Sequence, residues 1–303
     1  MIEKLLTEQP NPASAEIDTL STEQMLAVIN REDRHVADAV AREIPAIAQA
    51  VDAIAAVIER GGRLFYIGAG TSGRLGVLDA SECAPTFGVP AEMVQGVMAG
   101  GMHALYQSTE ASEDDAEAGA RDLAARGFRS SDALVGIAAS GRTPYVLGAV
   151  RAARQMGAIT AGISCTPDSE LSRAVDFPIA PTPGPEVIAG STRLKAGTAT
   201  KLVLNMISTG VMIRLGYVFG NLMVNVQPNN EKLLDRARRI VAAATQLDDA
   251  RAAELLAQAG GQVGVGIVMA KRNISREEAE RRLAAAQGRL RAAVGEGGAE
   301  VRR

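Results

Sequence analysis

Short apolar runs alternate with helix-forming stretches through the first two thirds of the chain. Five of these runs have the length and composition of buried β-strands, and they cover residues 63–67, 93–97, 133–137, 158–164 and 177–180. Strands that alternate with helices predict a parallel sheet covered by helices on both faces. We therefore expect an α/β protein built on a doubly wound, five-stranded parallel sheet.

Helical periodicity precedes the first strand. Ser21 and Gln24 have the spacing of a capping box, and apolar residues recur every three or four positions between Val36 and Ile58. Pro45 interrupts that stripe, so the sequence predicts two helices or one kinked helix. Because the stripe is wider than one sheet face requires, it also predicts a subunit interface, and we expect a homodimer.

The pattern changes again near residue 247, where three short helical stretches begin. They cover residues 251–258, 262–271 and 275–294. The sequence thus predicts an N-terminal helical segment (1–60), an α/β domain (61–246) and a small helical module (247–303).

The turn after the first predicted strand is rich in glycine and reads Gly68-Ala-Gly-Thr-Ser-Gly73. Backbone N–H groups, two hydroxyls and a helix N-terminus would surround one point there, and this combination suits a phosphate group. The spacing also fits the dinucleotide fingerprint, which requires an acidic residue about twenty positions further on. That position falls on Gly88-Val-Pro90, so a phosphate monoester is favoured over a dinucleotide.

A second turn of similar composition, Ser140-Gly-Arg-Thr143, follows the strand at residues 133–137. In an open parallel sheet both turns would lie at the carboxyl edge, where ligands bind. The predicted substrate-binding residues of the two turns are Gly70, Thr71, Ser72, Gly73, Ser140, Gly141 and Thr143.

A third polar cluster lies at the start of the long helix that is predicted near residue 195. Three hydroxyls and the cations Arg193 and Lys195 lie close together there, more than a helix cap requires. A capped helix start remains the simpler interpretation, but we favour a ligand site that uses Ser191 and Lys195. The upstream carboxylate Glu186 could reach the same site.

Charge and composition limit the classes of partner and cofactor. The net charge is −3 and no run of Lys or Arg occurs, which argues against nucleic-acid binding. No stretch has the length and apolarity of a signal peptide or membrane span, so we expect a cytoplasmic protein with reduced Cys83 and Cys165. Neither His35 nor His103 has a second His or Cys at ligand spacing, and we expect no metal and no cofactor.

Three long strings carry a resemblance to a known family: GAGTSGRLGVLDASECAPTFG, EVIAGSTRLKAGTATKLVLNMISTG and GNLMVNVQPNNEKL. They resemble the N-acetylmuramic acid 6-phosphate etherases of the sugar-isomerase (SIS) superfamily, and the similarity runs over nearly the whole chain. The resemblance implies an SIS-type αβα sandwich and a phosphorylated amino-sugar substrate. It also implies a lyase that releases D-lactate and N-acetylglucosamine 6-phosphate during peptidoglycan recycling.

Two catalytic glutamates of that family correspond to Glu82 and Glu113. An ether β to the aldehyde of an open sugar can be eliminated if one carboxylate removes the C2 proton and another protonates the leaving oxygen. We assign Glu113 as the base and Glu82 as the acid. Acidic residues surround Glu113, a pattern typical of a solvated helix face, so only the resemblance favours a catalytic role for it. A sugar-phosphate isomerase and a non-catalytic phosphosugar-sensing regulator remain the alternatives.

Overall fold

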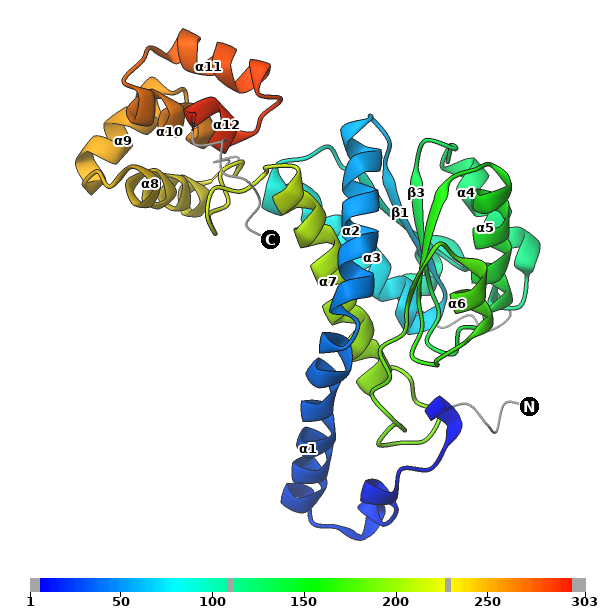
Figure 1. The fold of residues 1–303 in the computed structure, drawn as a ribbon. Helices are drawn as coiled ribbons and strands as arrows, with labels where there is room; N and C mark the ends of the chain where they lie inside the picture. The colour runs from blue at the N-terminus through cyan, green and yellow to red at the C-terminus, as the bar shows by residue number, and fades with distance from the viewer. Residues whose placement is uncertain (1–5, 108–111, 227–229, 296–303) are drawn as a thin grey trace. The chain divides into compact units, whose positions relative to one another are not determined.

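The computed structural model describes residues 6–107, 112–226 and 230–295 (Figure 1). The chain divides into two compact units. The first unit comprises Met1–Ser81 and Ala91–Gly210, and the second comprises Glu82–Pro90 and Val211–Arg303.

The first unit is built on a five-stranded sheet. Its strands are β1 (Leu64–Gly68), β2 (Val94–Met98), β3 (Ala133–Ile137), β4 (Ile159–Ile163) and β5 (Phe177–Ile179). Their order is β2-β1-β3-β4-β5, and all neighbouring strands are parallel. The predicted fold class is confirmed, and each strand lies within two residues of its predicted position.

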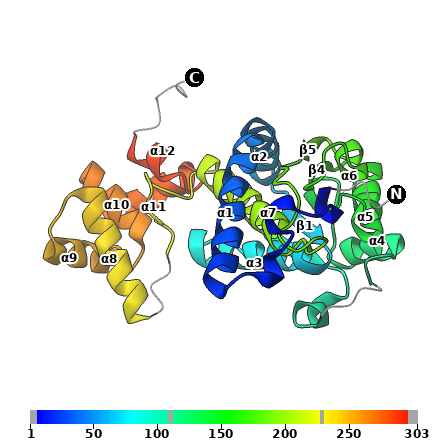
Figure 2. The same cartoon turned by 90° about the horizontal axis from the view of Figure 1, so that it is seen from below.

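Helices cover both faces of this sheet, as Figures 1 and 2 show. α2, α3 and α7 lie on one face, and α4, α5 and α6 lie on the other. These helices are α2 (Ile44–Glu59), α3 (Gly70–Phe87), α4 (Ala116–Ala125), α5 (Pro144–Gln155), α6 (Glu170–Ala174) and α7 (Lys195–Arg214). Their apolar faces and the strands, of which β1 and β3 are fully buried, enclose the core, so the sheet is a rigid platform for the loops at its carboxyl edge.

The N-terminal stripe forms two helices, α1 (Thr22–Ala41) and α2. The predicted capping box is present, because the Ser21 side chain accepts from Gln24 N and the Gln24 side chain accepts from Ser21 N. Pro45 lies in the first turn of α2, where its missing N–H costs no hydrogen bond. Of the two predicted alternatives, two helices or one kinked helix, the structure shows two helices.

Most of the apolar stripe on these helices is buried within one chain. Six of its seven members are buried, namely Val36, Val40, Ile47, Val51, Ile54 and Ile58, whereas Ile44 is 53 % exposed. The stripe thus leaves little apolar surface for a subunit interface, and the homodimer stays a prediction.

The second unit contains a helical module with its own core. Its helices are α8 (Glu231–Thr245), α9 (Asp249–Gln258), α10 (Val263–Arg272), α11 (Arg276–Ala285) and α12 (Leu290–Val294). Buried residues of α8, including Val241, pack in the same cluster as Leu256 and Ile267, although α8 lies before residue 247. The helix predicted over 275–294 is two helices, because Gln287 and Gly288 adopt positive φ between α11 and α12.

Among the described residues, no single helix is long and apolar enough to cross a membrane. Within the described ranges, one pair of helices, α9 and α10, is long and apolar enough when the two are taken together, and it is bent by 109°.

Candidate functional site

Two loops follow neighbouring strands at the carboxyl edge of the sheet, and they lead to helices on opposite faces. β1 pairs with β3 along its whole length, α3 follows β1 on one face, and α5 follows β3 on the other (Figure 1). A crevice forms outside the strands at such a switch point, and ligands of open α/β sheets bind there. The sequence order of the strands thus brings the two predicted phosphate loops side by side.

The β1–α3 loop places a helix N-terminus directly against the end of its strand. α3 begins at Gly70, whose φ is +53°, and a Cβ added at Gly73 would lie 2.6 Å from the Gly68 carbonyl oxygen. Only glycine permits that approach, which fixes the first turn of α3. The half-buried Thr71 and Ser72 lie in this turn, where their hydroxyls and free N–H groups suit an anion.

The β3–α5 loop has a comparable construction. Gly141 adopts a φ of +66° and donates its N–H to the Ala138 carbonyl at 2.8 Å. A Cβ added there would lie 2.3 Å from Ser169 Oγ, so a larger residue would displace the loop. The Ser140 hydroxyl accepts from Arg142 N at 3.3 Å, and the Thr143 side chain makes no capping hydrogen bond at the start of α5. Ser140 and Thr143 are thus held at a second helix N-terminus.

Glu113 lies between these two loops. A Cβ added at Gly70 would lie 3.0 Å from Glu113 Oε1, and the Glu113 carbonyl accepts from Tyr145 N at 3.1 Å. The half-buried Glu113 precedes α4 instead of lying on a solvated helix face. The sheet topology therefore brings one carboxylate to the predicted phosphate loops, a result that the acidic sequence around it does not reveal.

Glu82 lies on α3 with an exposed side chain, and its neighbour Cys83 is buried. It follows Gly70 by twelve residues, so about 18 Å of helix separates the two at a rise of about 1.5 Å per residue. Helix geometry alone does not bring Glu82 to the loop at the start of its own helix. A shared site for the two glutamates therefore stays a prediction.

The N-terminus of α7 adjoins the β1–α3 loop. A Cβ added at Gly197 would lie 3.5 Å from Thr71 Cγ2. The nearby Cys165 donates its N–H to the Ala139 carbonyl at 2.8 Å, and burial raises the pKa of its thiol to about 12. This thiol remains protonated near neutral pH, so its position favours packing over nucleophilic chemistry.

Glu186 caps α7 with its carboxylate. Its two oxygens accept from Lys195 N at 2.8 Å and from Ala196 N at 2.9 Å, and its side chain is buried. Burial raises the pKa of this carboxyl, although the two backbone hydrogen bonds oppose the shift. These contacts account for the burial of Glu186 without a ligand, and its role in substrate binding stays a prediction.

Lys195 also has a partner within the chain. Its Nζ lies 2.8 Å from Glu32 Oε2 and donates to the Pro185 carbonyl at 3.0 Å, with 2 % of its side chain exposed. Burial opposes the charged form of Glu32, but hydrogen bonds from Lys195 and Asn11 lower the pKa of its carboxyl. The cation thus joins α1 to the start of α7. Contact of Lys195 or the half-buried Ser191 with substrate stays a prediction.

Several known proteins are similar to this chain. A family model for the N-terminal SIS domain of glucokinase regulatory protein matches residues 46–154. An N-acetylmuramic acid 6-phosphate etherase of Aeromonas hydrophila is 55 % identical over 95 % of this chain and 96 % of its own. A protein of the same name from Rubrobacter xylanophilus is 54 % identical over 97 % of each chain. The chain belongs to this etherase family.

A solved structure has a fold similar to that of this etherase family member. A putative phosphosugar isomerase involved in capsule formation from Bacteroides fragilis superposes with a TM-score of 0.50. It is 21 % identical and matches 65 % of this chain and 92 % of its own. At this identity the likeness concerns the fold alone.

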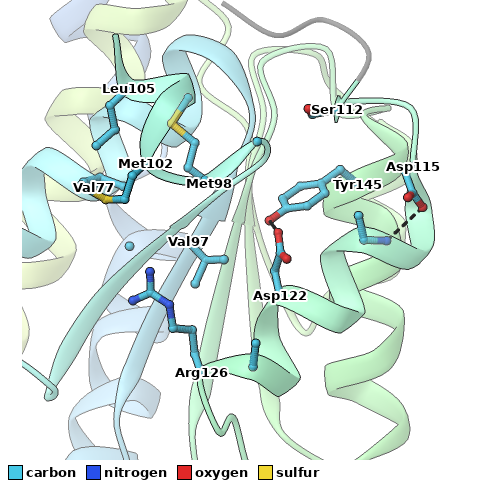
Figure 3. Close-up of a pocket in the computed structure, with 15 residues that line it drawn as sticks. Val77, Val97, Met98, Met102, Leu105, Ser112, Asp115, Asp122, Arg126 and Tyr145 are labelled. Carbon is cyan, nitrogen blue, oxygen red and sulfur yellow. Dashed lines mark hydrogen bonds between the residues drawn. The ribbon is translucent and has the colours of Figure 1, made fainter. Parts of the chain in front are cut away.

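A cavity of about 500 Å³ lies beside β2 in the first unit of this etherase family member (Figure 3). Its walls include Val97, Met98, Met102, Asp122, Arg126 and Tyr145. The hydroxyl residues of the two phosphate loops do not line it, but Ser112 and Asp115, which flank Glu113, do. This cavity has no signal in the sequence, because no local motif brings β2 and α4 together.

Among the described residues, no group of three or more His, Cys, Asp or Glu side chains is placed to hold a metal ion.

Proposed function

We propose that this protein cleaves the D-lactyl ether of N-acetylmuramic acid 6-phosphate and releases D-lactate and N-acetylglucosamine 6-phosphate. One observation carries the proposal: the Glu113 carboxylate lies beside the helix N-terminus at Gly70, and the Glu113 backbone carbonyl accepts a hydrogen bond from the main chain of α5. A substrate phosphate at the two loops would place the sugar ring within reach of that carboxylate. The identity of the proposed substrate is inferred from the names of the related etherases.

The two loops hold the 6-phosphate in this proposal. Backbone N–H groups at the starts of α3 and α5 and the hydroxyls of Thr71, Ser72, Ser140 and Thr143 are its donors. The net charge of −3 gives no long-range attraction for an anion, so these local donors supply the affinity.

The reaction is an elimination followed by addition of water. In the open-chain sugar, the C1 aldehyde acidifies the C2 proton, and Glu113 removes that proton. The C2 electron pair forms the C2–C3 double bond, the C3–O bond breaks, and Glu82 protonates the departing lactyl oxygen. Water then adds its hydroxyl to C3 and gives its proton to Glu82, while Glu113 returns a proton to C2, which restores both carboxyl groups. Each proton transfer of this type contributes about 10²–10⁴-fold to the rate.

The acid at each site belongs to a second copy of the chain in this proposal. The span of α3 between Gly70 and Glu82 separates the glutamate from the phosphate loop of its own chain. A closed two-fold dimer would let Glu82 of one copy meet Glu113 of the other. We therefore propose a homodimer, and a cytoplasmic location where amino-sugar phosphates are metabolised.

Replacing Ser72 or Ser140 by Ala is expected to weaken binding of the phosphorylated sugar by about 1.5–3 kcal/mol, because each change removes a hydrogen bond to a charged group. Calorimetric titration would measure the change. Ser131→Ala, which removes an exposed hydroxyl just before β3, is the matched control and should bind normally. Equal affinity of the wild type for phosphorylated and unphosphorylated sugar would contradict a phosphate site at these loops.

The proposed activity is tested by incubating the purified protein with N-acetylmuramic acid 6-phosphate and assaying lactate. Catalytic release of lactate is the expected result. Conversion of the sugar without lactate would identify an isomerase instead, and binding without turnover would identify a sensor.

A further inference from the structure

One tyrosine connects the Glu113 segment with the helix that follows it. The side chain of Tyr145, in the first turn of α5, is completely buried, and its hydroxyl donates to Asp122 Oδ2 of α4 at 2.6 Å. Figure 3 shows the phenol pointing toward this carboxylate. Burial raises the pKa of Tyr145, and the neighbouring Asp122 raises it further, so the hydroxyl remains a hydrogen-bond donor at any physiological pH.

The main chain of the same tyrosine holds Glu113, since Tyr145 N donates to the Glu113 carbonyl at 3.1 Å. Glu113 precedes α4 by three residues, and Asp122 lies in the second turn of that helix. One residue of α5 thus binds the segment at Glu113 through its backbone and at Asp122 through its side chain.

α4 and α5 approach so closely that only glycine fits at two positions. A Cβ added at Gly119 would lie 2.1 Å from the Tyr145 carbonyl oxygen, and one added at Gly148 would lie 1.8 Å from the Ala116 carbonyl oxygen. The backbones of the two helices are therefore in direct contact next to Glu113. A small slide of α4 along α5 would move the Glu113 backbone with it.

α4 packs against α5 and, through the buried Leu123, against the core of the sheet, but part of its surface borders a cavity. Toward β2, Asp122, Arg126 and Tyr145 line the cavity of about 500 Å³, which leaves space for α4 and the phenol to shift. The hydrogen bond between Tyr145 and Asp122 lies on the wall of this cavity (Figure 3). The bond adds a directional restraint at the part of α4 where packing is incomplete.

We propose that Tyr145, together with Asp122, is a positioning residue for Glu113. The hydroxyl-to-carboxylate bond fixes α4 against α5 and so holds the Glu113 carboxylate at the N-terminus of α3. We call the hydrogen bond between Tyr145 and Asp122 the clamp. The inference rests on the proposed function, because that function assigns Glu113 the proton transfer for which the clamp positions it.

Tyr145→Phe tests the clamp, because it removes only the hydroxyl. We expect exchange of the C2 hydrogen with solvent and release of lactate to fall together by about 10–100-fold, since a misplacement of about 1 Å costs a catalytic group that much. KM should change by less than about threefold, and calorimetry should still find one phosphosugar site per chain, because the phosphate loops are untouched. Tyr106→Phe, which removes a hydroxyl from a residue that is 88 % exposed, is the matched control and should retain wild-type rates.

Substitutions at Asp122 complete the test. Asp122→Ala should match Tyr145→Phe, whereas Asp122→Asn keeps an oxygen acceptor and should restore most of the rate. The double variant Tyr145→Phe/Asp122→Ala should be no slower than either single variant, because both remove the same bond.

Three outcomes would overturn the clamp. One is a wild-type rate in Tyr145→Phe, and another is a rate loss that only parallels a loss of binding stoichiometry, which would mean unfolded protein. The third is additive losses in the double variant. The proposed function fails separately, in the wild type, if that protein releases no lactate.

Discussion

Glu113→Gln is expected to abolish both exchange of the C2 hydrogen and release of lactate, while leaving phosphosugar binding within a few-fold of the wild type. The amide keeps the shape of the side chain beside Gly70 but cannot accept the C2 proton, so every later step is blocked. Loss of a general base costs about 10²–10⁴-fold. Deuterium incorporation at C2 in heavy water and an enzymatic lactate assay measure the two steps separately.

Glu82→Gln should separate the two steps. Its amide cannot protonate the departing lactyl oxygen, so lactate release should be lost, but the base remains and C2 exchange should continue. Glu117→Gln is the matched control and should leave both rates unchanged, since that exposed carboxylate pairs with the exposed Arg121 at 3.5 Å. Undiminished lactate release by Glu82→Gln would contradict its role as acid, and C2 exchange by Glu113→Gln at the wild-type rate would contradict the base.

Mixing the two inactive proteins is expected to restore activity. If each site takes Glu113 from one copy and Glu82 from the other, a mixed dimer of Glu113→Gln and Glu82→Gln has one complete site and one doubly defective site. Random exchange of equal amounts makes half of the dimers mixed, so about a quarter of the wild-type activity should return. The measurement is lactate release after mild denaturation and co-refolding.

Each variant treated in the same way alone is the control and should remain inactive. Sedimentation would report whether mixed dimers form. Mixed dimers without activity would place both glutamates of a site in one chain, and a fully active monomer would reject the dimer itself.

The sheet and its two loops could be predicted from sequence because their signals are local. A short apolar run ending in Gly68 and a glycine-rich turn with hydroxyls specify strand, turn and helix within about ten residues. Pro45 and the Ser21 capping box mark helix ends in the same way. Parallel pairing of β1 with β3 then brings the two loops together by topology.

Features that depend on contacts between distant parts of the chain could not be predicted in this way. Glu186 caps a helix that begins nine residues later, where the sequence analysis considered only hydroxyl caps. Lys195 pairs with Glu32 across 163 residues, so its burial has no local signal. The acidic residues around Glu113 indicate an exposed surface, and the contact with α5 that places it near the loops has no local signal. In the sequence, only the family resemblance indicates a catalytic role for Glu113.

The most direct test of the account follows two isotopes through the wild-type reaction with N-acetylmuramic acid 6-phosphate in water enriched in both deuterium and oxygen-18. Mass spectrometry of the products locates each label. Elimination followed by addition predicts deuterium at C2 and oxygen-18 in the C3 hydroxyl of N-acetylglucosamine 6-phosphate, with the ether oxygen retained in lactate. Lactate that contains oxygen-18, or lactate release without deuterium at C2, would contradict proton abstraction by Glu113 as the step that opens the ether.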